Sequence, residues 1–288
     1  MKRILVTGAN GQLGRCIKDA APYGDGVEIF YLTKADLDIA DAGAVSAHFS
    51  KNTYDYCVNT AAYTNVEQAE REREQAFSIN AGGVKNLAEA CEKQGTVFIQ
   101  ISTDYVFDGC KKTPYVETDS TNPINVYGAS KLKGEELLAE TMERFFILRT
   151  SWLYSQYGHN FLNTILKHSA AGKDLSITTE QLGTPTNAKD LATNIWALII
   201  SETKEYGIYH YSNRGEGTWF DFASEILKAS PLLSSTKLAK TEHYPTFAKR
   251  PKYSVLNTGK VEKLLKRTPL DWRDSLHTLI DTLITTHR

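Results

Sequence analysis

Tyr127 and Lys131, four residues apart, have the types and the spacing to move a proton. Side chains at this spacing share one face of a helix and lie close enough to interact. A lysine ammonium beside a phenol favours the phenolate, so the pair predicts a tyrosine whose pKa is lowered and which exchanges a proton near neutral pH. The motif alone is also typical of a surface helix with a packed tyrosine, so its neighbours decide the interpretation.

A hydroxyl suited to the same chemistry ends an apolar run upstream of this pair. The run from Thr96 to Ser102 predicts a buried strand, and alternation along a strand gives Ser102 and Thr103 opposite faces. We choose Thr103 as the hydroxyl that hydrogen-bonds a substrate carbonyl oxygen while Tyr127 protonates it. A strand-end hydroxyl that only caps a turn is the alternative. Tyr127, Lys131 and Thr103 are therefore the predicted catalytic residues.

A glycine-rich turn near the N-terminus predicts the second reactant. Gly8, Gly11 and Gly14 have the spacing G-x-x-G-x-x-G between a predicted strand and a helix that starts near Gln12. Glycine permits a tight turn and lets backbone amides approach a pyrophosphate, which a helix N-terminus attracts. This context predicts a dinucleotide site rather than a merely flexible turn. A nicotinamide cofactor would supply hydride, and Lys131 would also hold its ribose.

The end of the second predicted strand indicates which cofactor is used. Val27 to Leu32 is followed by Thr33 and Lys34, where a carboxylate normally binds the ribose 2′-hydroxyl of NAD. A lysine there would attract a 2′-phosphate, so we predict NADPH, with NADH as the alternative. The rest of the dinucleotide is expected to contact Asp38, Ile39, Ala62, Tyr63 and Thr64.

Strand and helix patterns alternate along the first half of the chain. Strands are predicted at 3–8, 27–32, 56–62, 96–102 and 145–148, and helices from 12, at 42–49, across 66–94 and at 127–144. This alternation predicts an α/β fold, a doubly wound parallel (Rossmann) sheet, with a smaller C-terminal substrate-binding lobe. We expect 1–154 plus about 187–215 in the dinucleotide-binding domain, and about 155–186 plus 216–288 in the lobe.

Composition excludes several classes of function. The 33 basic and 34 acidic residues give a net charge of −1, which argues against a nucleic-acid-binding surface. No apolar run reaches membrane-spanning length, and the scattered Cys16, Cys57, Cys91 and Cys110 predict free thiols. We therefore expect a cytoplasmic protein with no membrane or nucleic-acid partner. The acidic run from Glu67 to Glu74 predicts a solvated helix face.

Together these motifs resemble the extended short-chain dehydrogenase/reductase superfamily and, within it, the dTDP-4-dehydrorhamnose reductase family. The similar segments span nearly the whole chain: Val6–Gly14, Asn59–Thr64, Ser102–Phe107, Asn125–Lys131, Arg149–Tyr154, Gln181–Thr186 and Arg250–Pro251. The resemblance implies reduction of the 4-keto group of dTDP-4-dehydro-L-rhamnose, a nucleotide sugar, for polysaccharide biosynthesis.

The resemblance also implies roles for single residues. Gly11, Gln12 and Leu13 would meet the cofactor pyrophosphate. Thr103, Asp104 and Trp152 would contact the deoxysugar, with Tyr105 and Val66 near it. Arg250 would bind the diphosphate, since guanidinium grips phosphate bidentately; a solvated arginine is the alternative. Trp152 could equally be part of the core.

Three points stay open in the sequence. Magnesium and dimerisation through acidic residues are implied for some family members, but Arg15 follows the glycine turn here and no carboxylate cluster is nearby; we predict no metal site, and a monomer or a homodimer. Tyr105 stands where the related dehydratases have glutamate, which disfavours dehydration. A reductase or epimerase for another nucleotide sugar, or a non-catalytic regulatory subunit, remain the alternatives.

Overall fold

Six parallel strands form the central sheet in the computed structural model, which describes residues 1–22, 26–230, 236–242 and 245–286. They are β1 (Lys2–Thr7), β2 (Val27–Leu32), β3 (Tyr56–Asn59), β4 (Val97–Thr103), β5 (Phe145–Thr150) and β10 (Gly207–His210). Their order across the sheet is β10-β5-β4-β3-β1-β2, so the winding direction reverses between β1 and β3. Open α/β sheets bind ligands at the carboxyl ends of the strands beside such a reversal. The predicted doubly wound sheet is confirmed.

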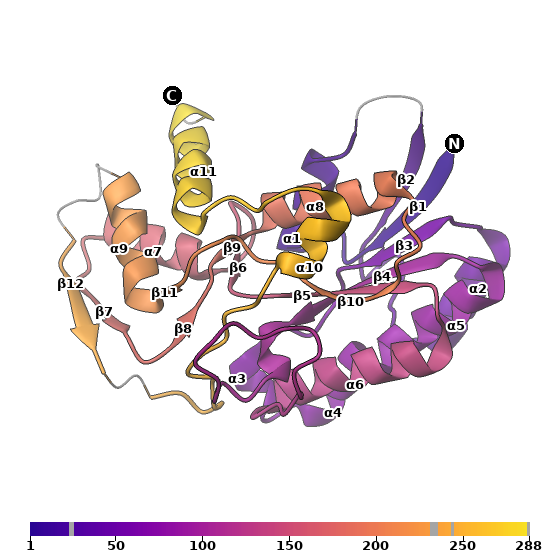
Figure 1. The fold of residues 1–288 in the computed structure, drawn as a ribbon, viewed down its shortest axis with the longest axis horizontal. Helices are drawn as coiled ribbons and strands as arrows, with labels where there is room; N and C mark the ends of the chain where they lie inside the picture. The colour runs from indigo at the N-terminus through magenta and orange to yellow at the C-terminus, as the bar shows by residue number, and fades with distance from the viewer. Residues whose placement is uncertain (23–25, 231–235, 243–244, 287–288) are drawn as a thin grey trace.

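Helices cover both faces of this sheet (Figure 1). One face carries α1 (Gln12–Asp19), α8 (Ala188–Ser201) and α10 (Gly259–Leu265); the other carries α2 (Ala42–Lys51), α5 (Val84–Gln94) and α6 (Val126–Thr141). The alternation of side chains along β1 divides the core, because Ile4 and Val6 join the first layer and Leu5 the second. Cys57 and Cys91 are buried free thiols in the second layer, as expected.

The region predicted as helical between 66 and 94 is interrupted. It contains α3 (Val66–Ala69), α4 (Arg73–Phe77) and a π-helix η1 (Ser78–Gly83) before α5 begins. A Cβ on Gly83 would lie 2.7 Å from the Ile39 side chain, so glycine allows the π-turn to pack tightly there. Such π-bulges occur often at functional sites. A 3₁₀ turn, η2 (Asp104–Val106), follows β4 at the same edge of the sheet.

A smaller lobe is built from α7 (Phe161–Ala170), α9 (Trp219–Ala229) and α11 (Trp272–Thr286), visible apart from the sheet in Figure 1. Short strand pairs accompany these helices: β7 (Leu175–Thr178) with β12 (Leu238–Thr241), β8 (Leu182–Gly183) with β11 (Gly217–Thr218), and β6 (Leu153–Tyr154) with β9 (Thr186–Asn187). The lobe has its own apolar core around Phe222 and Trp272. The predicted division into two parts stays a prediction; Val261 of α10, which it assigned to the lobe, packs in the core of the sheet. Among the described residues, no helix combines the length and the apolar character needed to cross a membrane.

Candidate active site

The glycine turn lies in the crevice between β1 and β3. Gly8 has φ +68°, and a Cβ there would lie 2.5 Å from the amide nitrogen of Ala61. A Cβ on Gly14 would lie 2.7 Å from the carbonyl oxygen of Gly8. Both positions therefore require glycine, since the turn touches the loop after β3 and the start of α1. Gly11 closes the turn by donating its N–H to the Gly8 carbonyl at 2.9 Å.

The residues after the turn contribute backbone rather than side chains. Leu13 is 4% exposed and packs in the core, so a ligand in the crevice could meet only its main chain. Gln12 donates from Nε2 to the Leu153 carbonyl at 3.3 Å and accepts from the Ser155 hydroxyl at 3.3 Å. Gln12 thus ties the glycine turn to the segment that leads into the lobe.

A cavity of about 660 Å³ opens beside the glycine turn, and two basic side chains without a predicted cofactor role, Arg15 and Lys18, line it. Its lining comprises Ala9, Asn10, Arg15, Lys18, Asp19, Tyr31, Thr33 and Tyr157. The Arg15 guanidinium stacks 3.7 Å from the ring centroid of Tyr157, and Tyr157 donates its hydroxyl to Asp19 at 2.7 Å. Lys34 does not line this cavity; its ammonium lies 3.6 Å from Asp38. The i, i+3 spacing of Arg15 and Lys18 on the first helix was the available signal.

The other predicted cofactor residues follow β3 or precede α2. Ile39 is 3% exposed and packs in the core, so its side chain is not available to an adenine. Asp38 accepts the Ala40 N–H at 3.0 Å. Ala62, Tyr63 and Thr64 continue the loop that touches the glycine turn at Ala61. Asn80 of η1 fixes this loop by accepting the Tyr63 N–H at 2.9 Å.

The start of α6 is held by its own cap residue and by groups from two distant segments. Asn125 caps the helix, accepting the Gly128 N–H at 2.7 Å, and donates its own amide to the Lys249 carbonyl at 2.8 Å. Glu70, just after α3, accepts the Val126 N–H at 2.8 Å. Tyr127, the second residue of α6, is therefore placed by local capping and by two long-range contacts.

Close packing brings Tyr127 to the end of β4. A Cβ on Gly128 would lie 2.1 Å from the Tyr105 carbonyl oxygen, so only glycine lets α6 approach η2 this closely. The rings of Tyr105 and Tyr127 meet edge to face with centroids 5.9 Å apart. Thr103 caps η2 by accepting the Tyr105 N–H at 3.2 Å, and its hydroxyl also interacts with the Tyr127 phenol. The structure thus brings the predicted Thr103 and Tyr127 together.

The predicted lowering of the Tyr127 pKa is wrong for this structure. Burial raises the pKa of Tyr127 to about 12, and the negative charge of Asp104 adds to this, while the Thr103 hydroxyl works in the other direction. Lys131 instead donates its ammonium to the Ile101 carbonyl at 2.6 Å and is 4% exposed. The sequence showed the pair but could not weigh how much solvent each residue loses.

Lys131 is strongly affected by the same burial. Loss of solvent lowers the pKa of Lys131 to about 8, and the carboxylate of Glu135, one helical turn further on, opposes that shift. Glu135 forms a buried ion pair with Arg149 at 2.6 Å and accepts the Ser102 hydroxyl. Ser102 and Thr103 thus have different partners, and the catalytic role of Thr103 stays a prediction.

The residues predicted to contact the sugar differ in their burial and in their partners. Asp104 is 2% exposed, and burial raises the pKa of its carboxyl to about 7, against hydrogen bonds from Ser254 and Thr103. Trp152 has φ +44° and stacks on Trp219 with centroids 3.6 Å apart. Trp152 is therefore part of an aromatic pair at the border of the lobe. Val66 starts α3 and is partly buried.

Arg250 separates two cavities at the border of the sheet domain and the lobe. One, of about 400 Å³, includes Phe161, His168, Ile177, Gln181 and Trp219 in its lining; the other, of about 900 Å³, includes Lys111, Lys112, Lys249 and Lys252. The guanidinium is 20% exposed and pairs with Glu67 at 2.5 Å. The run from Glu67 to Glu74 is therefore not a simple solvated face: Glu67 and Glu70 contact the site, and Glu72 accepts the Tyr63 hydroxyl at 2.7 Å.

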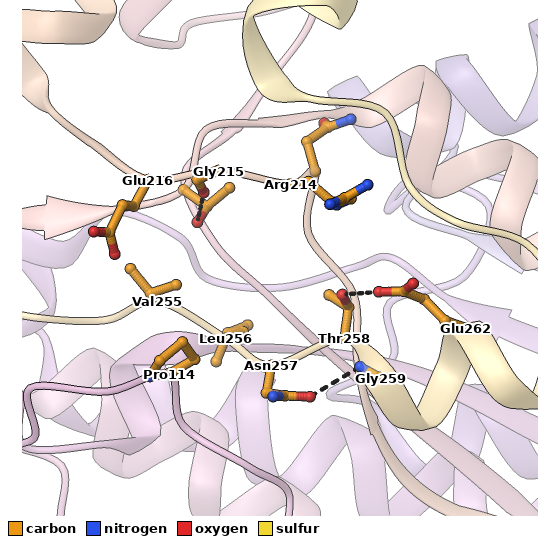
Figure 2. Close-up of a pocket in the computed structure, with 12 residues that line it drawn as sticks. Pro114, Arg214, Gly215, Glu216, Val255, Leu256, Asn257, Thr258, Gly259 and Glu262 are labelled. Atoms are coloured by element: carbon orange, nitrogen blue, oxygen red, sulfur yellow. Dashed lines mark hydrogen bonds between the residues drawn. The ribbon is translucent and has the colours of Figure 1, made fainter.

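A further cavity of about 390 Å³ lies apart from these residues, between the loop after β10 and the segment that enters α10 (Figure 2). Figure 2 shows Arg214 and Glu216 on one side and Asn257, Thr258 and Glu262 on the other. Thr258 donates to Glu262 at 2.6 Å. None of the residues predicted from the sequence lines this cavity. In the described part of the chain, no three His, Cys, Asp or Glu side chains gather as a metal site would require.

The class of protein follows from the sheet and from two of its strand ends. The sheet reverses between β1 and β3, a glycine turn follows β1, and Thr103 with Tyr127 lies at the end of β4, an arrangement typical of a nucleotide-dependent short-chain dehydrogenase/reductase. The sequence model described as "RmlD substrate binding domain" matches residues 1–285. The chain therefore belongs to the RmlD, or dTDP-4-dehydrorhamnose reductase, family.

Individual relatives agree with this assignment. The dTDP-4-dehydrorhamnose reductase of Aggregatibacter actinomycetemcomitans is 38% identical, over 96% of this chain and 97% of the relative. The spore coat polysaccharide biosynthesis protein SpsK of Bacillus subtilis is 40% identical, over 96% of each. The crystal structure of the Bacillus anthracis dTDP-4-dehydrorhamnose reductase in complex with NADP superposes with a TM-score of 0.92 at 36% identity, covering 98% of this chain and 99% of that one.

Proposed function

We propose that this chain catalyses the NADPH-dependent reduction of the 4-keto group of dTDP-4-dehydro-L-rhamnose to give dTDP-L-rhamnose. The observation that carries the proposal is the partly buried phenol of Tyr127 beside the hydroxyl of Thr103, the last residue of β4. Full-length relatives that bear the name of this reductase support the choice of substrate.

Each residue of the site has a separate role in the reduction of a carbonyl group. NADPH, when bound, supplies the hydride. Thr103 and Tyr127 hydrogen-bond the carbonyl oxygen, and Tyr127 then gives up its phenolic proton to it. A pKa of about 12 keeps the phenol protonated at neutral pH, and an alkoxide is a stronger base than a phenolate, so the transfer is favourable. The positive charge of Lys131, on the same face of α6, stabilises the phenolate that remains.

The crevice beside the glycine turn suits the cofactor. Gly8, Gly11 and Gly14 allow backbone amides to approach the pyrophosphate at the N-terminus of α1, as do Gln12 and Leu13 through their main chain. Arg15 and Lys18 supply two positive charges in the adjoining cavity, which would attract a 2′-phosphate. We expect the loops after β2 and β3 to complete the dinucleotide site through Asp38, Ala62, Tyr63 and Thr64 and through the main chain of Ile39, whose side chain is in the core.

We expect the substrate on the side of the catalytic residues away from the cofactor, between η2, α3 and the lobe. We expect Asp104, Trp152, Tyr105 and Val66 to contact the deoxysugar, and Arg250, which lines a cavity rich in lysine, to bind the diphosphate. Tyr105 has no carboxyl group to move protons in a dehydration. Reduction of a different nucleotide sugar is the second candidate.

The test follows NADPH oxidation at 340 nm with dTDP-4-dehydro-L-rhamnose generated in situ. Wild-type protein should turn over, and Tyr127→Phe should lose about 2 to 4 decades of kcat because the general acid is gone. Phenylalanine keeps the aromatic ring that packs against Tyr105, so the melting temperatures of the wild type and the variant should be similar. Absence of wild-type turnover would refute the proposed reaction.

A further inference from the structure

The carboxylate of Glu67, the second residue of α3, is engaged by a distant segment of the lobe. We call residues 246–252 the strap. Glu67 accepts the backbone N–H groups of Phe247 at 2.8 Å and Ala248 at 3.2 Å, and the guanidinium of Arg250 at 2.5 Å. One carboxylate thus holds three donors that lie about 180 residues further along the chain.

The strap is also fixed on its other side. Asn125, which caps α6, donates to the Lys249 carbonyl at 2.8 Å. A Cβ on Gly109 would lie 2.6 Å from the Cα of Pro251, so the loop after η2 packs directly on the strap. Arg250 therefore occupies a defined position in the wall between the two cavities, and its guanidinium reaches the Tyr105 hydroxyl.

The charges indicate what this wall is suited to bind. Lys111, Lys112, Lys249 and Lys252 line the larger cavity together with Arg250, against Asp108 and Glu216. Partial burial raises the pKa of Glu67, but the hydrogen bonds from Arg250, Ala248 and Phe247 outweigh it, so the net shift is downward and the group is a carboxylate at neutral pH. An anionic ligand in the cavity would approach an arginine that is already paired with Glu67.

We propose that Glu67 is the positioning residue for the diphosphate of the nucleotide sugar: it fixes the strap against α3 and holds the Arg250 guanidinium in the cavity wall. This inference rests on the proposed function, because it assumes a nucleotide diphosphate as ligand. Without Glu67, Arg250 and the strap lose their anchor on the sheet domain, and a ligand must order them as it binds. The cost of this ordering appears in the affinity for the substrate rather than in the chemical step.

Calorimetric titration with dTDP, the part of the substrate that lacks the ketone, measures this effect directly. Glu67→Ala should weaken dTDP binding about tenfold, because one charge-assisted contact of a partly exposed pair is lost. Glu67→Asp should recover part of the affinity. Glu74→Gln is the matched control, since Glu74 belongs to the same acidic run but is exposed on α4, and it should bind dTDP as the wild type does.

Three further measurements separate positioning from a general structural effect. The affinity of Glu67→Ala for NADPH should equal that of the wild type, and kcat with the nucleotide sugar should change less than KM. In a double-mutant cycle, Glu67→Ala should add little to Arg250→Ala, because Glu67 acts through Arg250.

Unchanged or tighter dTDP binding by Glu67→Ala would overturn the inference; tighter binding would mean that Glu67 competes with phosphate for Arg250. Additive losses in the cycle would also overturn it. Wild-type protein that binds NADPH but not dTDP would refute the proposed function and this inference together. Wild-type turnover with an unaffected Glu67→Ala would refute the inference alone.

Discussion

Replacing Arg15 by leucine tests which cation recognises the 2′-phosphate of NADPH. The end of β2 pointed to Lys34, whereas the cavity beside the glycine turn contains Arg15 and Lys18. Leucine keeps the apolar stem and the helix propensity of arginine while removing the guanidinium. Lys34→Leu is the matched control, because Lys34 is exposed and lies 3.6 Å from Asp38.

The expected size of the effect follows from the exposure of the site. A charge-assisted hydrogen bond between guanidinium and phosphate contributes about 1.5–3 kcal/mol, which corresponds to roughly 10- to 150-fold in affinity. Arg15 is exposed, so solvent screens the contact and the lower end applies. Stacking on Tyr157 at 3.7 Å holds the guanidinium in place before the cofactor binds. We therefore expect about a tenfold loss.

The assay is kcat/KM for NADPH and for NADH at a saturating concentration of the nucleotide sugar. Arg15→Leu should lose about tenfold with NADPH and remain unchanged with NADH, which lacks the phosphate. The loss should shrink as the ionic strength rises, because salt screens exposed charges. Lys34→Leu should change both values by less than about twofold.

Two results would refute this reasoning. An equal loss with both cofactors would mean that Arg15 supports the turn or the shared part of the dinucleotide. A larger loss in Lys34→Leu than in Arg15→Leu would place the phosphate at the end of β2, as the sequence suggested. In either case the reaction assigned to Tyr127 would be unaffected.

Two other substitutions test the environment of the catalytic helix. Gly128→Ala should destabilise the fold by about 1–3 kcal/mol in urea unfolding and lower kcat, because its Cβ would lie 2.1 Å from the Tyr105 carbonyl and would push Tyr127 away from Thr103; a stable, fully active variant would contradict this packing argument. For Asp104→Asn the measurement is the free energy of unfolding against pH. Burial raises the pKa of Asp104 to about 7, so its stabilisation is complete below about pH 4, the unfolded value, and is lost as the pH rises through 7. Asparagine does not titrate, so the free energy of unfolding of the variant, relative to that of the wild type, should rise by a few kcal/mol between about pH 4 and pH 8. A difference independent of pH would show that the pKa of the Asp104 carboxyl is not raised.

The parts of the structure that the sequence predicts well are those with local signals. Periodicity locates the strands of the sheet, and the spacing of Gly8, Gly11 and Gly14 locates the turn. Tyr127 and Lys131 share a helix, so their common face follows from the i, i+4 relation alone. Strand alternation also separates Ser102, which contacts Glu135, from Thr103, which interacts with Tyr127.

Properties that depend on long-range packing could not be predicted in this way. The sequence shows a lysine beside a tyrosine, but the pKa of Tyr127 is set by burial under neighbouring elements. The sequence predicts Glu67 to be one of several solvated acidic residues, because its partners in the strap lie about 180 residues away. From the sequence, Arg15 indicates only that no acidic residue follows the glycine turn. Its stacking on Tyr157 and its place in the cavity depend on the fold.

The long-range contacts converge on one short stretch, the start of α6. Glu70 after α3 and the cap residue Asn125 accept its first amides, and Gly128 packs closely on η2. Asn125 also holds the strap that carries Arg250. The proton donor and the predicted diphosphate ligand are therefore positioned by the same cap residue. Because Glu67 and Asn125 hold the strap before any ligand binds, the proposed phosphate site and the orientation of Tyr127 rest on one preformed set of contacts.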